Sequence, residues 1–215
     1  MLDLTQGSLD VAPLLLGAHL TVRDDAGAVT VRLTEVEAYD GANDPGSHAY
    51  RGLTPRTEVM FGPPGRLYVY FTYGMHWCAN VVCGEDGRAS AVLLRAGEVV
   101  DGVELARSRR PAAKKDVDLA RGPARMAQAL GLARPDNGVV LSPGGRAELL
   151  APAAAAEEIA TGPRVGVSGP GGDGETYPWR FWLPGDPTVS TYRPGVRRRR
   201  RPTDGGRAGT TDGAH

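Results

Sequence analysis

Two neighbouring stretches of alternating side chains constrain the fold of this chain most strongly. Residues 19–24 (HLTVRD) and 28–39 (AVTVRLTEVEAY) are rich in Val and Thr, and the turn formers of residues 25–28 (DAGA) lie between them. This alternation is typical of half-buried strands, and the short connection predicts a β-hairpin. We therefore expect a β-sheet at the centre of the fold.

Further strands and short helices should surround this hairpin. Residues 66–74 and 76–84 predict a second hairpin, and residues 89–96 predict the strand after it. The remaining expected elements are helices over residues 8–17 (capped by Ser8), 99–108 and 122–131 (with Pro123 near its first turn and Gly131 past its end), and late strands over 164–169 and 179–185. The chain thus combines a sheet with short helices.

The length of 215 residues fits one globular domain. No apolar run approaches the ~18 residues of a membrane span, and the first residues, MLDLTQGSLD, lack the basic then apolar order of a secretory signal. Cys78 and Cys83 are too few for a disulfide framework or a zinc site, so both are expected to be buried thiols. We expect a cytoplasmic monomer (nucleoid-associated if prokaryotic) without membrane contact, metal or cofactor.

The formal net charge of zero is unevenly distributed. Residues 193–215 hold seven arginines and two acidic residues, which leaves a net charge of −5 in residues 1–192. The composition of this tail is of low complexity and predicts disorder, so we place the domain at 1–192. Residues 51–134 carry a net charge of +5, which suits either a phosphate-facing patch or an ordinary solvated face. Bulk charge alone therefore does not identify a nucleic-acid-binding protein.

Two glutamates end the first predicted hairpin. Strand alternation puts Glu35, Glu37 and Tyr39 on one face together with Leu33. Two carboxylates beside an aromatic ring are candidates for acid or base catalysis, although a pair at a solvated strand edge would have the same spacing. The following loop, residues 40–48 (DGANDPGSH), is longer than a simple chain reversal requires.

The second hairpin is rich in tyrosine. Tyr68 and Tyr70 share a strand face, and Tyr73 precedes Gly74 at the turn, where it should be exposed. Tyrosines on one face either pack in the core or form a slot for a flat ring. Asn80 on the opposite strand is either bonded to backbone or placed to contact the edge of a base.

Long segments of the chain resemble the alkyladenine (3-methyladenine, methylpurine) DNA glycosylase family. The resemblance runs in order from about residue 9 to residue 192. It is carried by EVEAYDG, DPGSHAYRGLTPRTEVMFGPPGRLYVYFTYGMHWCANVV, AVLLRA, RGPARMAQALG, RVGVSG and WRFW. It implies an α+β fold, a single mixed domain in which helices flank a curved antiparallel sheet, with a protruding β-hairpin that enters the minor groove of DNA.

The resemblance also implies a reaction. A member of this family is a monofunctional DNA glycosylase that flips an alkylated or deaminated purine out of double-stranded DNA and hydrolyses the N-glycosidic bond, which starts base excision repair. Glu37 resembles the general base that activates water, and Arg95 resembles an arginine beside that water. Glu35 would then be structural. The only lysines, Lys114 and Lys115, lie outside these motifs, which disfavours a lyase step through an amine.

The pocket residues follow from the same resemblance. Tyr39 and His48 resemble the wall on one side of the extruded base, and Tyr70 resembles the wall on the other. Asn80 is similar to an asparagine that crowds the minor-groove edge of a purine. Tyr73 resembles the residue that fills the gap left in the duplex.

Two other functional classes stay open at this point. A non-catalytic lesion or nucleic-acid-binding protein could keep the pocket without turnover, and a hydrolase of free nucleosides is a weaker alternative. The sequence does not rank 3-methyladenine, 7-methylguanine, hypoxanthine and ethenoadenine as lesions. It also leaves open the effect of the loop at 169–177 and the role of the arginine-rich tail.

Overall fold

An antiparallel sheet forms the centre of the protein. The computed structural model describes residues 2–72 and 74–195, and within them eight strands form one sheet. The strand order is β3-β4-β5-β2-β1-β6, while β8 pairs with β2 and β7 pairs with β8. The strands are β1 (His19–Asp24), β2 (Gly27–Tyr39), β3 (Leu67–Thr72), β4 (His76–Val82), β5 (Ala91–Asp101), β6 (Ala147–Leu150), β7 (Ala160–Gly162) and β8 (Arg180–Trp182).

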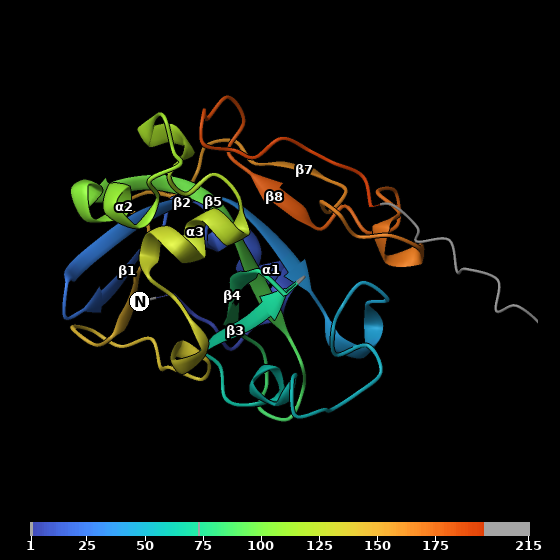
Figure 1. The fold of residues 1–215 in the computed structure, drawn as a ribbon. Coiled ribbons are helices and arrows are strands. Elements are labelled where there is room, and N and C mark those ends of the chain that lie inside the picture. The colour runs from blue at the N-terminus through green and yellow to red at the C-terminus, as the bar shows by residue number, and fades with distance from the viewer. Residues whose placement is uncertain (1, 73, 196–215) are drawn as a thin grey trace, which may run out of the picture.

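Within the described residues, three α-helices pack on this sheet. They are α1 (Ser8–Leu14), α2 (Val103–Arg109) and α3 (Pro123–Leu130), and single 3₁₀ turns occur at Gly41–Asn43, Glu58–Phe61, Asp116–Asp118, Arg134–Asp136 and Pro170–Gly172. Pro123 starts α3 and Gly131 ends it in the left-handed conformation (φ 69°), as the sequence predicts. Figure 1 shows the curved sheet with α2 and α3 next to each other, and α3 contacts β2, β4 and β5.

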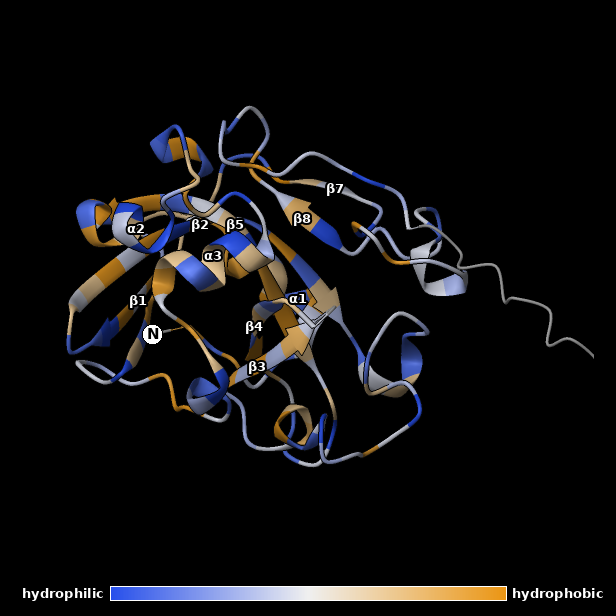
Figure 2. Cartoon of the chain, in the orientation of Figure 1, coloured by the Kyte–Doolittle hydropathy of each residue, from blue (hydrophilic) through white to orange (hydrophobic). Residues whose placement is uncertain are grey.

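The hydrophobic core lies between the helices and the middle of the sheet. Val11, Leu33, Val81, Leu94 and Met126 represent the elements that meet there, and each is at most 1% exposed. Figure 2 shows hydrophobic residues concentrated on the central strands and hydrophilic residues on the surrounding loops. This arrangement confirms the predicted α+β class with a curved antiparallel sheet and flanking helices.

The long strand β2 changes face at one point. Val31 and Leu33 belong to the core, and so do Val36 and Ala38, although the two pairs have opposite parity along the strand. The register with β5 shifts between Leu33 and Val36, which marks β-bulges at this place. An extra residue in one strand of a pair reverses the inward and outward alternation beyond it. The expectation that Glu35 and Glu37 share a face with Leu33 is therefore wrong.

The bulges coincide with a change of neighbour. Residues 27–32 of β2 pair with β1, whereas residues 35–37 pair with β8. Thr34 is skipped in the register of β2 with β5, and Arg95 is skipped on the β5 side. The two irregularities turn Glu37 and Arg95 out of the core side and toward the region described below.

The hairpin of β3 and β4 has the predicted faces. Leu67 and Val69 belong to the core, while Tyr68 and Tyr70 stack on the other side with ring centroids 5.3 Å apart. Met75, just after the turn, is 68% exposed. Residue 73 lies outside the described residues, so insertion of Tyr73 into DNA stays a prediction.

Three local predictions are wrong. Gly7, not Ser8, is the N-cap of α1, and the Ser8 backbone instead donates to the Ser90 hydroxyl (2.9 Å). Residues 99–101 extend β5 rather than starting a helix, because the length of β2 provides pairing partners up to Asp101. Residues 164–169 form a turn rather than a strand, since Gly166 (φ 73°) and Gly169 (φ 76°) interrupt an extended chain.

Other predictions concern the termini, the cysteines and the membrane. Cys78 and Cys83 are buried free thiols, as expected. Within residues 2–72 and 74–195, no helix is long and apolar enough to cross a membrane. The predicted tail lies almost entirely outside the described residues, and the domain boundary at residue 192 stays a prediction.

Candidate active site

A pocket of about 440 Å³ opens where the second half of β2, the β3–β4 hairpin and three loops meet. Its volume is in the range of small-molecule sites. The residues that line it are Glu37, Tyr39, Pro45, Gly46, His48, Met60, Tyr68, Tyr70, Thr72, His76, Cys78, Asn80, Leu93, Arg95, Pro123, Ala124, Val165, Gly166, Val167 and Ser168. Carboxylate, guanidinium, amide and phenol groups thus converge on one cavity.

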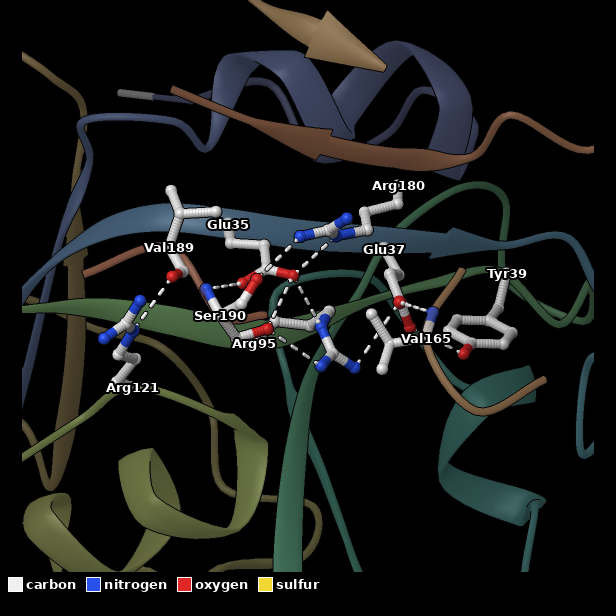
Figure 3. A network of polar contacts seen from close by, with 9 residues as sticks. All are labelled: Glu35, Glu37, Tyr39, Arg95, Arg121, Val165, Arg180, Val189 and Ser190. Atoms are coloured by element: carbon white, nitrogen blue, oxygen red, sulfur yellow. Dashed lines mark hydrogen bonds and ion pairs between the residues drawn. The ribbon is translucent and has the colours of Figure 1, made fainter. Parts of the chain in front are cut away.

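Glu37 is fully buried from solvent, yet it forms part of the pocket wall. Its Oε1 accepts a hydrogen bond from the backbone N–H of Val165 (2.6 Å), and its Oε2 accepts one from the hydroxyl of Tyr39 (2.9 Å). Nη1 of Arg95 lies 3.4 Å from Oε1. These contacts, drawn in Figure 3, fix the orientation of the carboxylate at the pocket.

Glu35 has a different environment, although it lies only two residues earlier on β2. Its Oε1 accepts hydrogen bonds from Nε of Arg180 (2.7 Å), Nε of Arg95 (2.9 Å) and the hydroxyl of Ser190 (3.0 Å). Its Oε2 accepts the backbone N–H of Ser190 (2.7 Å). Burial alone would raise the pKa of Glu35, but Arg95, Arg180 and the donors of Ser190 hold it below its usual value.

Arg95 connects the two carboxylates. It is 5% exposed, binds Glu35 directly, and extends Nη1 toward Glu37 at the pocket wall. Burial favours the neutral form, yet Glu37 and then Glu35 raise the pKa of Arg95, so it stays charged. Figure 3 also shows Arg121, whose Nε donates to the backbone carbonyl of Val189 (3.0 Å), the residue before Ser190.

Aromatic rings form another part of the pocket. Tyr68 and Tyr70 stack on each other, and the ring of His48 packs edge to face on Tyr70, with the two ring centroids 4.7 Å apart. Burial raises the pKa values of both tyrosines, so their hydroxyl groups stay protonated. Since His48 and Tyr70 touch, a base could stack between them only after His48 moves. The ring nitrogens of His48 make only long contacts, at 3.3 Å with Tyr68 and 3.4 Å with Arg56.

The ionisation of Tyr39 and His48 is shifted in opposite directions. Burial, and next the Glu37 carboxylate, raise the pKa of Tyr39 well above its usual value. Tyr39 is therefore a permanent hydrogen-bond donor to Glu37. Desolvation, and next the Arg56 guanidinium, lower the pKa of His48 to about 4, so this ring is neutral near pH 7.

Asn80, on β4, is another lining residue of the pocket. It is 4% exposed, and its Nδ2 donates to the backbone carbonyl of Tyr68 (3.0 Å). The bond to the backbone is thus confirmed, whereas contact of Asn80 with the edge of a base stays a prediction for a side chain that also lines the cavity.

Six of the seven site residues expected from the sequence meet at this pocket. They are Glu37, Tyr39, His48, Tyr70, Asn80 and Arg95, and the seventh, Tyr73, lies outside the described residues. Across residues 2–72 and 74–195, no group of three or more His, Cys, Asp or Glu side chains is placed to hold a metal ion.

Sequence reasoning missed several contributors to the pocket. Tyr68 was detectable, since it shares a strand face with Tyr70. The turn at 165–168 was assigned to a strand, and its backbone donor to Glu37 left no signal in the residue types. The buried ion pair of Arg164 and Asp44 behind Tyr39 also left no signal in the residue types.

Sequence comparisons relate this chain to known proteins. The sequence profile of the methylpurine-DNA glycosylase family matches residues 3–187. Relatives named as candidate 3-methyladenine DNA glycosylases include one from Streptomyces avermitilis, 57% identical over 90% of this chain and 91% of its own. A second relative, from Leifsonia xyli, is 54% identical over 86% of this chain and 88% of its own length. A third, from Nocardia farcinica, is 56% identical over 83% of this chain and 84% of its own length.

Proposed function

Because the chain belongs to the methylpurine-DNA glycosylase family, we propose that it removes alkylated or deaminated purines from double-stranded DNA by monofunctional hydrolysis. Membership makes the chain a hydrolase of N-glycosyl bonds and a DNA repair enzyme, as the resemblance implied. The choice of damaged base, its extrusion from the duplex and the roles of individual residues belong to the proposal.

The observation that carries the proposal is the environment of Glu37. A buried carboxylate with two fixed hydrogen bonds, a nearby arginine and an open pocket in front of it is suited to hold and deprotonate a water molecule. The activated water would attack the anomeric carbon of the extruded nucleotide. Arg95 would lie beside this water and balance the charge of Glu37.

The damaged base itself assists the reaction. An alkylated purine that carries a positive charge is a good leaving group, so the demand for a general acid is small. It is also electron-poor and interacts favourably with aromatic faces such as those of Tyr39 and Tyr70. Asn80, in the pocket lining, would contact the edge of the purine and disfavour undamaged guanine.

Extrusion of the nucleotide is part of the proposal, since chemistry on a base in duplex DNA requires the base to leave the stack at a cost of roughly a few kcal/mol. Tyr73 would compensate by filling the gap. Lys114 and Lys115 lie outside the pocket lining, which supports hydrolysis by water over an amine nucleophile.

The direct test uses duplexes that hold one 3-methyladenine, 7-methylguanine, hypoxanthine or ethenoadenine each. Release of the free base under single-turnover conditions, with Glu37→Gln as the matched inactive variant, would support the proposal. Binding of lesion duplexes without base release by the wild-type chain would instead identify a non-catalytic lesion-binding protein. Release from free nucleosides at the rate seen with duplexes would contradict the assignment of DNA as substrate.

A further inference from the structure

Arg164 is the largest fully buried side chain of the protein's described part, and it lies directly behind the pocket. Its guanidinium forms a two-pronged ion pair with Asp44, with Nη1 2.5 Å from Oδ2 and Nη2 2.6 Å from Oδ1. It also donates to the carbonyls of Ala38 (2.9 Å) and Gly171 (2.8 Å). Four hydrogen bonds from one planar group leave it little freedom to move.

These contacts join two loops that are far apart in the sequence. Asp44 belongs to the loop after β2, whose next residues, Pro45 and Gly46, line the pocket. Gly171 belongs to the segment after the turn at 165–168, which lines another part of it. The two backbones pass so closely that a Cβ on Gly171 would collide with Gly46, so the junction depends on close packing as well as on charge.

Both groups that donate hydrogen bonds to Glu37 adjoin Arg164. Val165, the residue after Arg164, donates its backbone N–H to Oε1 of Glu37. The ring of Tyr39, whose hydroxyl donates to Oε2, lies under the guanidinium with its centroid 4.5 Å from Cζ. Movement of Arg164 would therefore displace both donors together.

We propose that Arg164, held by Asp44, is a positioning residue for base excision, which acts by fixing Val165 and Tyr39 on the carboxylate of Glu37. This role rests on the proposed function of Glu37. Arg164 itself is absent from the pocket lining, so it contributes geometry rather than contact with the base.

The test compares Arg164→Lys with Arg146→Lys. Lysine keeps the charge but cannot form the planar set of four bonds. Misplacement of a reacting group by about 1 Å can cost ~10²-fold in rate, so single-turnover excision at saturating Arg164→Lys should fall roughly 10- to 100-fold. Affinity for a lesion duplex should stay within about threefold.

Arg146 is a matched control. It also forms an ion pair, with Asp136 (2.7 Å), and donates to the carbonyl of Gly131 (3.1 Å), but it lies outside the pocket lining. Arg146→Lys should lower the melting temperature and leave excision within about threefold of wild type. Equal losses of excision in both variants would reduce the role of Arg164 to general stability and overturn the proposal.

A double variant separates positioning from a merely structural role. If Arg164 acts through Glu37, then Arg164→Lys should change the residual rate of Glu37→Gln by less than about threefold. A loss as large as in the wild-type background would overturn the proposal. Full activity of Glu37→Gln alone would refute the assignment of Glu37, whereas full activity of Arg164→Lys beside an inactive Glu37→Gln would refute only the positioning role.

Asp44→Asn provides a second, milder variant in case Arg164→Lys does not fold. The amide keeps the shape of the side chain and one acceptor for Arg164, but it removes the charge. Circular dichroism and melting establish that it is folded, and excision should then fall roughly 3- to 30-fold. A folded Asp44→Asn protein with an unchanged rate would overturn the proposal.

Discussion

Glu35 and Glu37 lie on one strand, two residues apart and both fully buried, yet their surroundings differ in kind. Glu35 accepts four hydrogen bonds from two arginines and Ser190 and has no place in the pocket wall, whereas Glu37 accepts two and borders the pocket. Depth of burial therefore does not distinguish a structural carboxylate from a reactive one. What distinguishes them is whether fixed partners occupy the oxygens and whether a cavity lies in front of them.

The largest effect is expected from Glu37→Gln. The amide keeps the shape of the side chain but cannot accept a proton from water, so excision should fall ~10²- to 10⁴-fold. Binding of a lesion duplex should change little. Single-turnover base release and fluorescence titration measure the two quantities, and a rate within about threefold of wild type would exclude Glu37 as the general base.

Glu35→Gln should mainly lower the stability of the fold. Removal of one partner from a buried ion pair leaves uncompensated charge, here on Arg95 and Arg180, and costs about 3–5 kcal/mol of folding free energy. Urea unfolding measures this loss. The folded fraction should lose less than about tenfold in excision, and a loss equal to that of Glu37→Gln at unchanged stability would erase the proposed division of roles.

Tyr39→Phe sharpens the comparison by removing one of the two donors to Glu37. A hydrogen bond to a charged group contributes about 1.5–3 kcal/mol, so excision should fall roughly tenfold if part of that energy orients the carboxylate. Tyr68→Phe is the matched control, because its hydroxyl contacts His48 rather than a carboxylate. Similar rates for the two variants would show that the contact of Tyr39 with Glu37 does not matter.

The smallest effect is expected from His48, in the dependence of the free energy of unfolding on pH below neutrality. Its pKa of about 4 lies below the usual value, so the unfolded chain binds a proton more readily than the folded chain between these two pH values. The contribution of His48 to the free energy of unfolding is therefore fully present above pH ~6.5 and decreases as the pH falls toward about 4. The ring packs against Tyr68 and Tyr70, which desolvates part of it, but the residue as a whole is exposed, so solvent screening should keep the effect small.

His48→Gln isolates this contribution. Urea unfolding at pH 7 and pH 5 should show that wild type loses slightly more stability than the variant over this interval. The opposite difference would mean that the folded protein favours charged His48.

Local patterns predicted the parts of the fold that depend on near neighbours in sequence. The β1–β2 hairpin, the faces of Tyr68 and Tyr70, and the ends of α3 follow from alternation, from turn formers and from the positions of Pro123 and Gly131. The resemblance to a family supplied the site residues, and six of them meet at one pocket.

Local patterns could not predict features that depend on distant partners. The face change in β2 coincides with the replacement of β1 by β8 beside the strand, and Arg180 of β8, which pairs with Glu37, lies 143 residues further along the chain. The burial of Arg164 also depends on a distant partner. The ion pair with Asp44, 120 residues earlier in the chain, makes full burial of this charge possible.

The skipped residue Thr34 has a consequence for how this protein tolerates change. Its side chain only bonds Thr188, and many substitutions would keep the backbone path. Without the bulge, strict alternation along the same sequence would instead place Glu37 on the core side with Leu33 and turn Val36 and Ala38 toward the pocket. The side of the sheet that Glu37 faces is thus set by the irregular backbone between Leu33 and Val36, and not by the residue types of the strand alone.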